Sequence, residues 1–192
     1  MANKEINSWA LNIKNLLFQT GFGYAWDNPQ FENYDAFFDA WKQRLLDIDR
    51  QQWYTSINTM TSLRCYTQFK FDSFVEPYTI QTYLPRKFIA NLRCASIDIE
   101  CNQGRKHNIP YDQRICTVCN TLQIGDEYHF VLICPLLTEL RIKYLPAYYY
   151  NYPTQIKLNT LLSSTSKHTI TSLALYIMNA IELRKLFLDN EP

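Results

Sequence analysis

Apolar side chains recur at helical spacing through the first third of the chain. Their spacing between residues 8 and 20 predicts a first helix, and Gly21 supplies the stop signal. An aromatic-rich loop is expected over 21–29. Because residues 33–68 contain neither proline nor glycine, we expect one long helix there, or two that join near Asp49-Arg50. The apolar positions expected to face a core are Phe37, Phe38, Trp41, Leu45, Ile48, Trp53, Ile57 and Met60.

The middle of the chain mixes helical and alternating patterns. Residues 72–77 interrupt the periodicity, and a helix is expected over 78–94, with Pro85 kinking or restarting it. Residues 96–101 alternate apolar and polar side chains, which predicts a short strand. A loop with a basic tip is expected over 102–110.

The last third returns to helical spacing. Pro135 suits the first turn of a helix, where its missing N–H is not needed, and Cys134 is then the boundary residue. A tyrosine-rich connector over 145–153, a short helix over 154–163 and a final helix over 167–188 complete the pattern.

Composition indicates a folded, intracellular protein. Hydrophobic residues make up 47% of the 192 residues and aromatic residues 15%, more than a disordered chain carries. The length suits one domain, or a core with a small appendage. We expect neither a signal peptide nor a membrane span, and therefore a nuclear or cytoplasmic location. In that reducing environment the six cysteines are expected to be metal ligands or buried thiols rather than disulfides.

Charge is balanced overall but uneven along the chain. The formal net charge is +1, so no global basic field indicates nucleic acid or membrane. Residues 64–114, however, hold eight Lys and Arg against five Asp and Glu. The basic residues expected to contact phosphates are Arg86, Lys87, Arg93, Arg105, Lys106 and Arg114. The alternative is that they form an ordinary solvated surface.

Chemistry concentrates in one short stretch, in which Cys116, Cys119, His129 and Cys134 form the pattern C-x2-C-x9-H-x4-C. Two thiolates two residues apart can chelate one ion from a tight turn, and a second His and Cys complete a tetrahedral structural zinc site. Four protein ligands leave no open position, so we expect Zn²⁺ to hold structure and not to catalyse. Asp126 is expected to cap the segment that carries His129, and the carboxylates of Asp126 and Glu127 to orient the metal ligands. For these carboxylates, the alternative is an acid/base cluster with His129. The alternative is that the cysteines are buried thiols and His129 is a core histidine.

Other constellations are weaker. Cys94, Cys101 and His107 lack a fourth ligand for a second metal site. The chain has three histidines and four glycines, and it contains no G-x-S-x-G elbow or phosphate-binding glycine loop. We therefore expect no enzymatic activity from this chain alone and no small-molecule substrate.

Several short stretches follow one another in a recognisable order: Arg93-Cys94, Asp98 to Arg105, Asn108 to Pro110, Asp112 to Cys119, and Gly125 to Pro135 with Arg141. This order resembles the C-terminal region of LINE-type (non-LTR) retrotransposon reverse transcriptases. The resemblance implies a helical segment behind a polymerase, with a CCHC zinc unit that helps to grip RNA or DNA, and Cys116, Cys119, His129 and Cys134 as the ligands. The chain departs from the full family pattern because it has no polymerase carboxylate pair and no endonuclease constellation.

Together these features predict a mainly α protein with a small zinc-stapled unit that contains a short hairpin or strand. We expect a helical region over 1–92, the CCHC unit over 93–145, and C-terminal helices over 146–192 that pack on the first region. The leading functional hypothesis is a non-catalytic nucleic-acid-binding module, with RNA or DNA and a reverse-transcriptase core as partners. The alternative is a protein-interaction or scaffold module without nucleic-acid binding.

Overall fold

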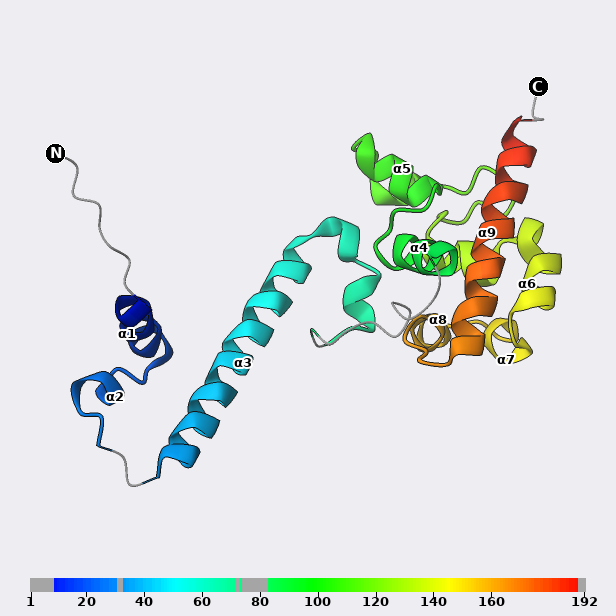
Figure 1. Ribbon diagram of the computed structural model, residues 1–192. Helices are drawn as coiled ribbons and strands as arrows, with labels where there is room; N and C mark the ends of the chain where they lie inside the picture. Colours follow the sequence, from blue (N-terminus) through cyan, green and yellow to red (C-terminus); the bar gives the residue numbers. More distant parts are fainter. Residues whose placement is uncertain (1–8, 31–32, 72, 74–82, 190–192) are drawn as a thin grey trace. The chain divides into compact units, whose positions relative to one another are not determined.

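The computed structural model describes residues 9–30, 33–71, 73 and 83–189. It is mainly helical, as the sequence predicts, and Figure 1 labels its helices. The chain divides into two compact units, Met1–Thr55 and Ser56–Pro192. The sequence-based division at 92/93 and 145/146 is a different partition and stays a prediction.

The first unit contains α1 (Trp9–Thr20), α2 (Tyr24–Asp27) and most of α3 (Tyr34–Thr59). The predicted helix over 8–20 is confirmed. It ends at Gly21, whose φ of 85° is accessible to glycine without strain. The amides of Gly21 and Phe22 then satisfy the last carbonyls of α1, donating to Phe18 O at 3.2 Å and Leu17 O at 2.8 Å.

α3 is one continuous helix through Asp49-Arg50, and two short 3₁₀ turns follow it, η1 (Thr61–Leu63) and η2 (Tyr66–Gln68). The expected core-facing positions are buried to different degrees. Ile57 is the only buried residue of α3, and the half-buried positions are Phe37, Trp41, Leu45, Ile48 and Trp53. Phe38 and Met60 are exposed. The long helix therefore presents apolar side chains at its surface.

The core of the second unit forms where α9 (Lys167–Asp189) packs against α4 (Tyr83–Arg93) and α6 (Thr138–Tyr144). Figure 1 shows α9, in orange to red, running beside these helices. Tyr176 of α9 is completely buried and donates its hydroxyl to Phe130 O at 2.6 Å. The remaining fully buried large side chains include Leu92, Ile99, Leu137, Leu158, Leu161, Leu173 and Ile177.

Pro85 is the third residue of α4 as the structure describes this helix. Residues 74–82 lie outside the described part of the chain, and with them most of the expected break over 72–77 and the start of the helix predicted from 78. The helix predicted up to 94 is otherwise confirmed as far as Arg93.

The strand predicted over 96–101 is wrong, and the loop predicted over 102–110 is confirmed only for residues 107–110. Residues 96–99 are irregular, and α5 (Glu100–Lys106) occupies most of the expected loop. Ile97, Ile99 and Cys101 are buried, so the alternation does mark inward-facing side chains. They are buried by a turn, in which Ile99 N donates to Ile97 O at 3.1 Å, and not by a sheet.

The later predictions are confirmed more closely. Pro135 begins the 3₁₀ turn η6 (Pro135–Leu137), which leads into α6. The helix predicted over 154–163 is α8 (Gln155–Leu162), and the final helix is α9. The connector contains the short helix α7 (Ala147–Tyr150). Among the described residues, no helix combines the length and apolarity that a membrane crossing requires.

Candidate metal centre

The first two cysteines lie in a tight turn between two short extended segments. Ile115 and Ile124 form an isolated antiparallel bridge, and Cys116 N donates to Gln123 O at 2.8 Å. Next to them, Gly125 N donates to Arg114 O at 2.8 Å. These bonds close the loop that carries both thiols, so that C-x2-C spacing turns the two sulfurs toward one point.

The histidine and the last cysteine are carried by a π-helical turn, η5 (His129–Ile133). Cys134 N donates to His129 O at 2.8 Å, which is an i to i+5 bond. Asp126 Oδ1 accepts from His129 N at 2.9 Å and caps the turn. The wider π turn brings residue 134 back beside residue 129, so the two side chains can bind the same metal ion.

The four donor atoms converge, because the sulfurs of the three cysteines and a ring nitrogen of His129 all lie within 4.8 Å of one another. Cys119 Sγ is 3.3 Å from His129 Nε2. Cys116, His129 and Cys134 are buried, and Cys119 is half-buried. The chemistry of this donor set fits a metal ion with four protein ligands.

Neighbouring groups prepare the donors for that role. His129 Nδ1 lies 3.1 Å from Gln123 Oε1, and this contact holds the imidazole ring so that Nε2 lies 3.3 Å from Cys119 Sγ. A hydrogen bond from Cys134 lowers the pKa of Cys116, although burial opposes it, and the same hydrogen bond together with burial raises the pKa of Cys134. The Cys116 sulfur is therefore stabilised as a thiolate, the form that binds metals.

A buried ion pair lies behind Cys116. Arg184 of α9 donates Nη2 to Glu100 Oε1 at 2.8 Å and Nη1 to Cys116 Sγ at 3.8 Å. Glu100 Oε1 also accepts from Thr117 N at 2.9 Å and from Thr117 Oγ1 at 2.6 Å. Glu100 and Arg184 thus connect α5 and α9 to the turn that carries the first two sulfurs.

Arg141 holds the segment that carries His129 and Cys134. It is buried, and it donates Nε to Val131 O and Nη2 to Cys134 O, each at 2.9 Å. Both acceptors are carbonyls of the segment that follows His129. The guanidinium therefore satisfies backbone oxygens at the end of η5 and holds Cys134 in place.

Glu127 does not belong to the cluster. It is buried and accepts from Arg64 Nη2 at 3.0 Å and from Asn102 Nδ2 at 3.1 Å. The predicted cap by Asp126 is confirmed, whereas Glu127 contacts Arg64 and Asn102 and not the four candidate ligands. Glu127 therefore joins Arg64, which follows η1, and Asn102 of α5 to the segment that precedes η5.

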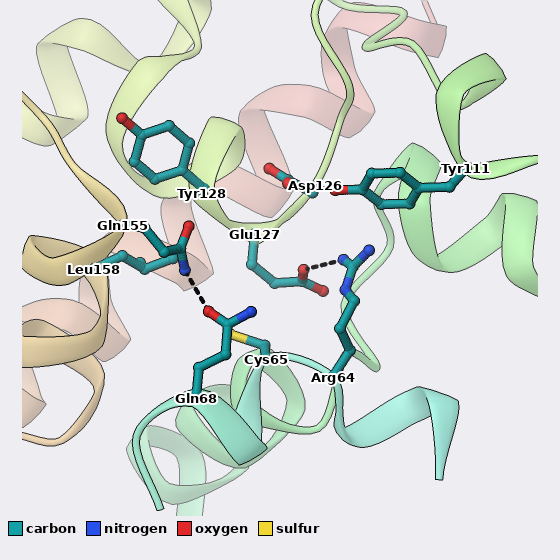
Figure 2. Close-up of a pocket in the computed structure, with 9 residues that line it drawn as sticks. All are labelled: Arg64, Cys65, Gln68, Tyr111, Asp126, Glu127, Tyr128, Gln155 and Leu158. Carbon is teal, nitrogen blue, oxygen red and sulfur yellow. Dashed lines mark hydrogen bonds and ion pairs between the residues drawn. The ribbon is translucent and has the colours of Figure 1, made fainter. Parts of the chain in front are cut away.

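A pocket of about 500 Å³ opens beside this network. Figure 2 shows Glu127 and Arg64 paired between Tyr111 and Tyr128, which lie on opposite sides, and Gln68 bonded to Gln155. Burial and the nearby Asp126 carboxylate raise the pKa of Tyr111 to about 12. Its phenol stays protonated near neutral pH and donates to Asp126 Oδ2 at 2.9 Å.

The six residues predicted to contact phosphates differ in their exposure. Arg93 is 2% exposed, donates to Leu162 O, and stacks over the Phe69 ring at 4.8 Å. Its assignment to a phosphate contact is wrong, because its guanidinium is used inside the core. The exposed members of the set are Arg86, Lys87 and Lys106.

Arg105 and Arg114 are only partly exposed and are tied to the backbone. Arg105 Nη2 donates to Ala95 O at 2.9 Å, and Arg114 Nη1 donates to Cys101 O at 3.0 Å.

Sequence inspection missed three residues around the cluster, Glu100, Gln123 and Arg184, because no local spacing relates them to the four ligands.

The fold and the site define a mainly helical protein with one Cys3His metal-ligand cluster in its described part. Comparison with protein-family models, curated proteins and solved structures finds no match for this chain.

Proposed function

We propose that Cys116, Cys119, His129 and Cys134 hold a structural Zn²⁺ ion. Three thiolates and an imidazole are a preferred tetrahedral ligand set for zinc, and the four donor atoms already converge. With every coordination position taken by protein, the ion polarises no substrate and generates no hydroxide. Its role is to tie the 116–119 turn to η5.

We further propose that this chain is a non-catalytic nucleic-acid-binding module related to the C-terminal region of LINE-type reverse transcriptases. The observation that supports it is the attachment of α5 to the metal-bearing segment. Cys101 N donates to Gly125 O at 3.0 Å, and Glu100 accepts from Thr117. The basic end of α5, with Arg105 and Lys106, is therefore held in a fixed position relative to the zinc unit.

Exposed basic side chains on α4 and α5 supply the phosphate contacts in this proposal. Arg86 and Lys87 lie near the start of α4, and Lys106 ends α5. Lysine and arginine that neutralise phosphates release counterions, so affinity falls as salt rises. The resemblance to LINE-type reverse transcriptases and these exposed basic side chains favour RNA or DNA as the partner.

Filter binding of the zinc-loaded chain to structured RNA and to duplex DNA, over a series of salt concentrations, tests this proposal. The Lys106→Gln variant is expected to weaken binding to every sequence and to reduce the salt slope by about 1. Lys143→Gln is the matched control, because Lys143 is an exposed lysine on α6 outside the proposed set. Absence of binding at low salt, or equal effects of the two variants, would contradict the proposal.

A protein-interaction role is the second candidate, and the exposed aromatic residues of the first unit favour it. Trp9 is 78% exposed and Phe18 51%. The other exposed aromatic residues of α1, α2 and the first half of α3 include Tyr24, Trp26, Tyr34 and Phe38. Aromatic side chains of this kind are enriched at protein interfaces.

Co-elution with a LINE-type reverse-transcriptase core in size-exclusion chromatography tests the second role. A Trp9→Gln variant that loses co-elution but keeps RNA binding would assign the partner surface to the first unit. Retention of co-elution by that variant would remove Trp9 from the interface.

A further inference from the structure

Three arginines from separate segments line one pocket of the second unit. The pocket measures about 480 Å³, within the roughly 300–1,000 Å³ of typical ligand sites. Arg64 follows η1, Arg105 belongs to α5, and Arg114 follows the 3₁₀ turn η4 (Tyr111–Gln113). None of the described residues that line it carries a carboxylate.

The positive charge of this pocket is only partly compensated. Arg64 pairs with Glu127 at 3.0 Å. The hydrogen-bond acceptors of Arg105 and Arg114 in the described structure are the carbonyl oxygens of Ala95, Ile109 and Cys101, with a longer contact to Cys101 Sγ. Carbonyls orient a guanidinium without neutralising it, so two of the three positive charges remain available to a ligand.

The same contacts hold the guanidinium groups in place before any ligand arrives. Arg64 stacks over the Tyr111 ring at 4.6 Å. Arg114 donates both Nε and Nη2 to Ile109 O, at 2.9 Å and 2.6 Å. Groups that are already ordered lose little side-chain entropy on binding. Guanidinium also matches the geometry of phosphate oxygens better than ammonium does.

We propose that this pocket binds a phosphate group through Arg64, Arg105 and Arg114. A terminal phosphate on a nucleic-acid strand and a small phosphorylated molecule present the same dianionic chemistry to it. This inference rests on the proposed nucleic-acid function only where it names a nucleic-acid strand as a source of the phosphate group. Arg64 lies outside the set that sequence inspection selected.

Two variants test the pocket in the zinc-loaded full chain. Arg105→Gln removes one charge and is expected to weaken phosphate binding about tenfold, and Arg105→Lys is expected to recover part of the loss. Asn108→Asp adds a negative charge at an exposed lining position, and its φ of 55° is one that aspartate tolerates. Asn151→Asp, an exposed site after α7, is the matched control.

The probes are inorganic phosphate and adenosine monophosphate, measured by calorimetry, and a short single-stranded RNA with or without a terminal phosphate, measured by anisotropy. Saturable phosphate binding that Asn108→Asp weakens and Asn151→Asp leaves unchanged supports the pocket. Phosphate binding without any RNA binding would keep the pocket and overturn the nucleic-acid proposal. RNA binding unaffected by Arg105→Gln and Asn108→Asp, with no saturable phosphate binding, would overturn the pocket alone. Thermal melting of each variant separates lost binding from lost folding.

Discussion

The ion pair between Glu100 and Arg184 is expected to be one of the most sensitive points of the second unit. Its side chains are 11% and 5% exposed, and its atoms lie 2.8 Å apart. Arg184→Met keeps a long, flexible side chain in the same space but removes the guanidinium. The change also deletes the donor to Cys116 Sγ.

The magnitude follows from burial. At 2.8 Å and an effective dielectric constant of about 20, the Coulomb attraction is about 6 kcal/mol before desolvation is subtracted. Removal of one partner leaves the other charge buried, which typically costs about 3–5 kcal/mol. We therefore expect Arg184→Met to lower the free energy of unfolding by about 4 kcal/mol, or Tm by roughly 10 °C.

Urea denaturation followed by circular dichroism, in buffer that contains zinc, measures this loss. The wild type, Arg184→Met, Glu100→Gln and the double variant form a double-mutant cycle. Glu100→Gln removes the charge that needs a partner, so the double variant should lose less than the sum of the single losses. A loss below about 1 kcal/mol for Arg184→Met, or single losses that add within about 0.5 kcal/mol, would refute the reasoning.

Three further predictions concern the cluster and the core. Cys134→Ser is expected to abolish stoichiometric zinc binding in native mass spectrometry and to remove stabilisation on the order of 10 kcal/mol. The control variant Cys94→Ser should keep the metal, and equal metal content in the two variants would exclude Cys134 as a ligand. A methyl group at Gly125 would collide with the Glu100 side chain, so Gly125→Ala should cost about 1–3 kcal/mol in urea denaturation, and an unchanged midpoint would show that Glu100 moves freely. Because the Arg93 guanidinium is buried and donates to Leu162 O, Arg93→Met should lower Tm and leave the RNA affinity of the folded protein unchanged. A loss of RNA affinity without a loss of Tm would show that Arg93 contacts RNA.

The structure also explains how the segment with the four candidate metal ligands is joined to the rest of the second unit. Arg184 reaches it from α9, Glu100 from α5, and Arg141 from α6. Tyr176 adds a buried hydrogen bond to Phe130 O. Since these groups come from three helices, loss of the proposed ion is expected to loosen the packing of α9 as well as the turn itself.

Local features were readable from the sequence. The four donor residues occur within one short window, and C-x2-C and H-x4-C spacings bring side chains together through single turns, so the cluster could be predicted without knowledge of the fold. The helices α1, α8 and α9 were likewise predicted, because each repeats apolar residues at the helical period and ends near a glycine or a polar break.

Features that depend on distant partners were decided only by the tertiary structure. Residues 96–101 alternate like a strand, but in the described chain no second strand pairs with them, and α5 begins at Glu100 instead. Arg93 resembles a surface cation in the sequence, yet it donates to Leu162 O, 69 positions away. Glu100 and Arg184 are separated by 84 positions. A charge becomes a core partner or a surface group according to what packs against it, and that packing depends on the assembled helices rather than on neighbouring residues.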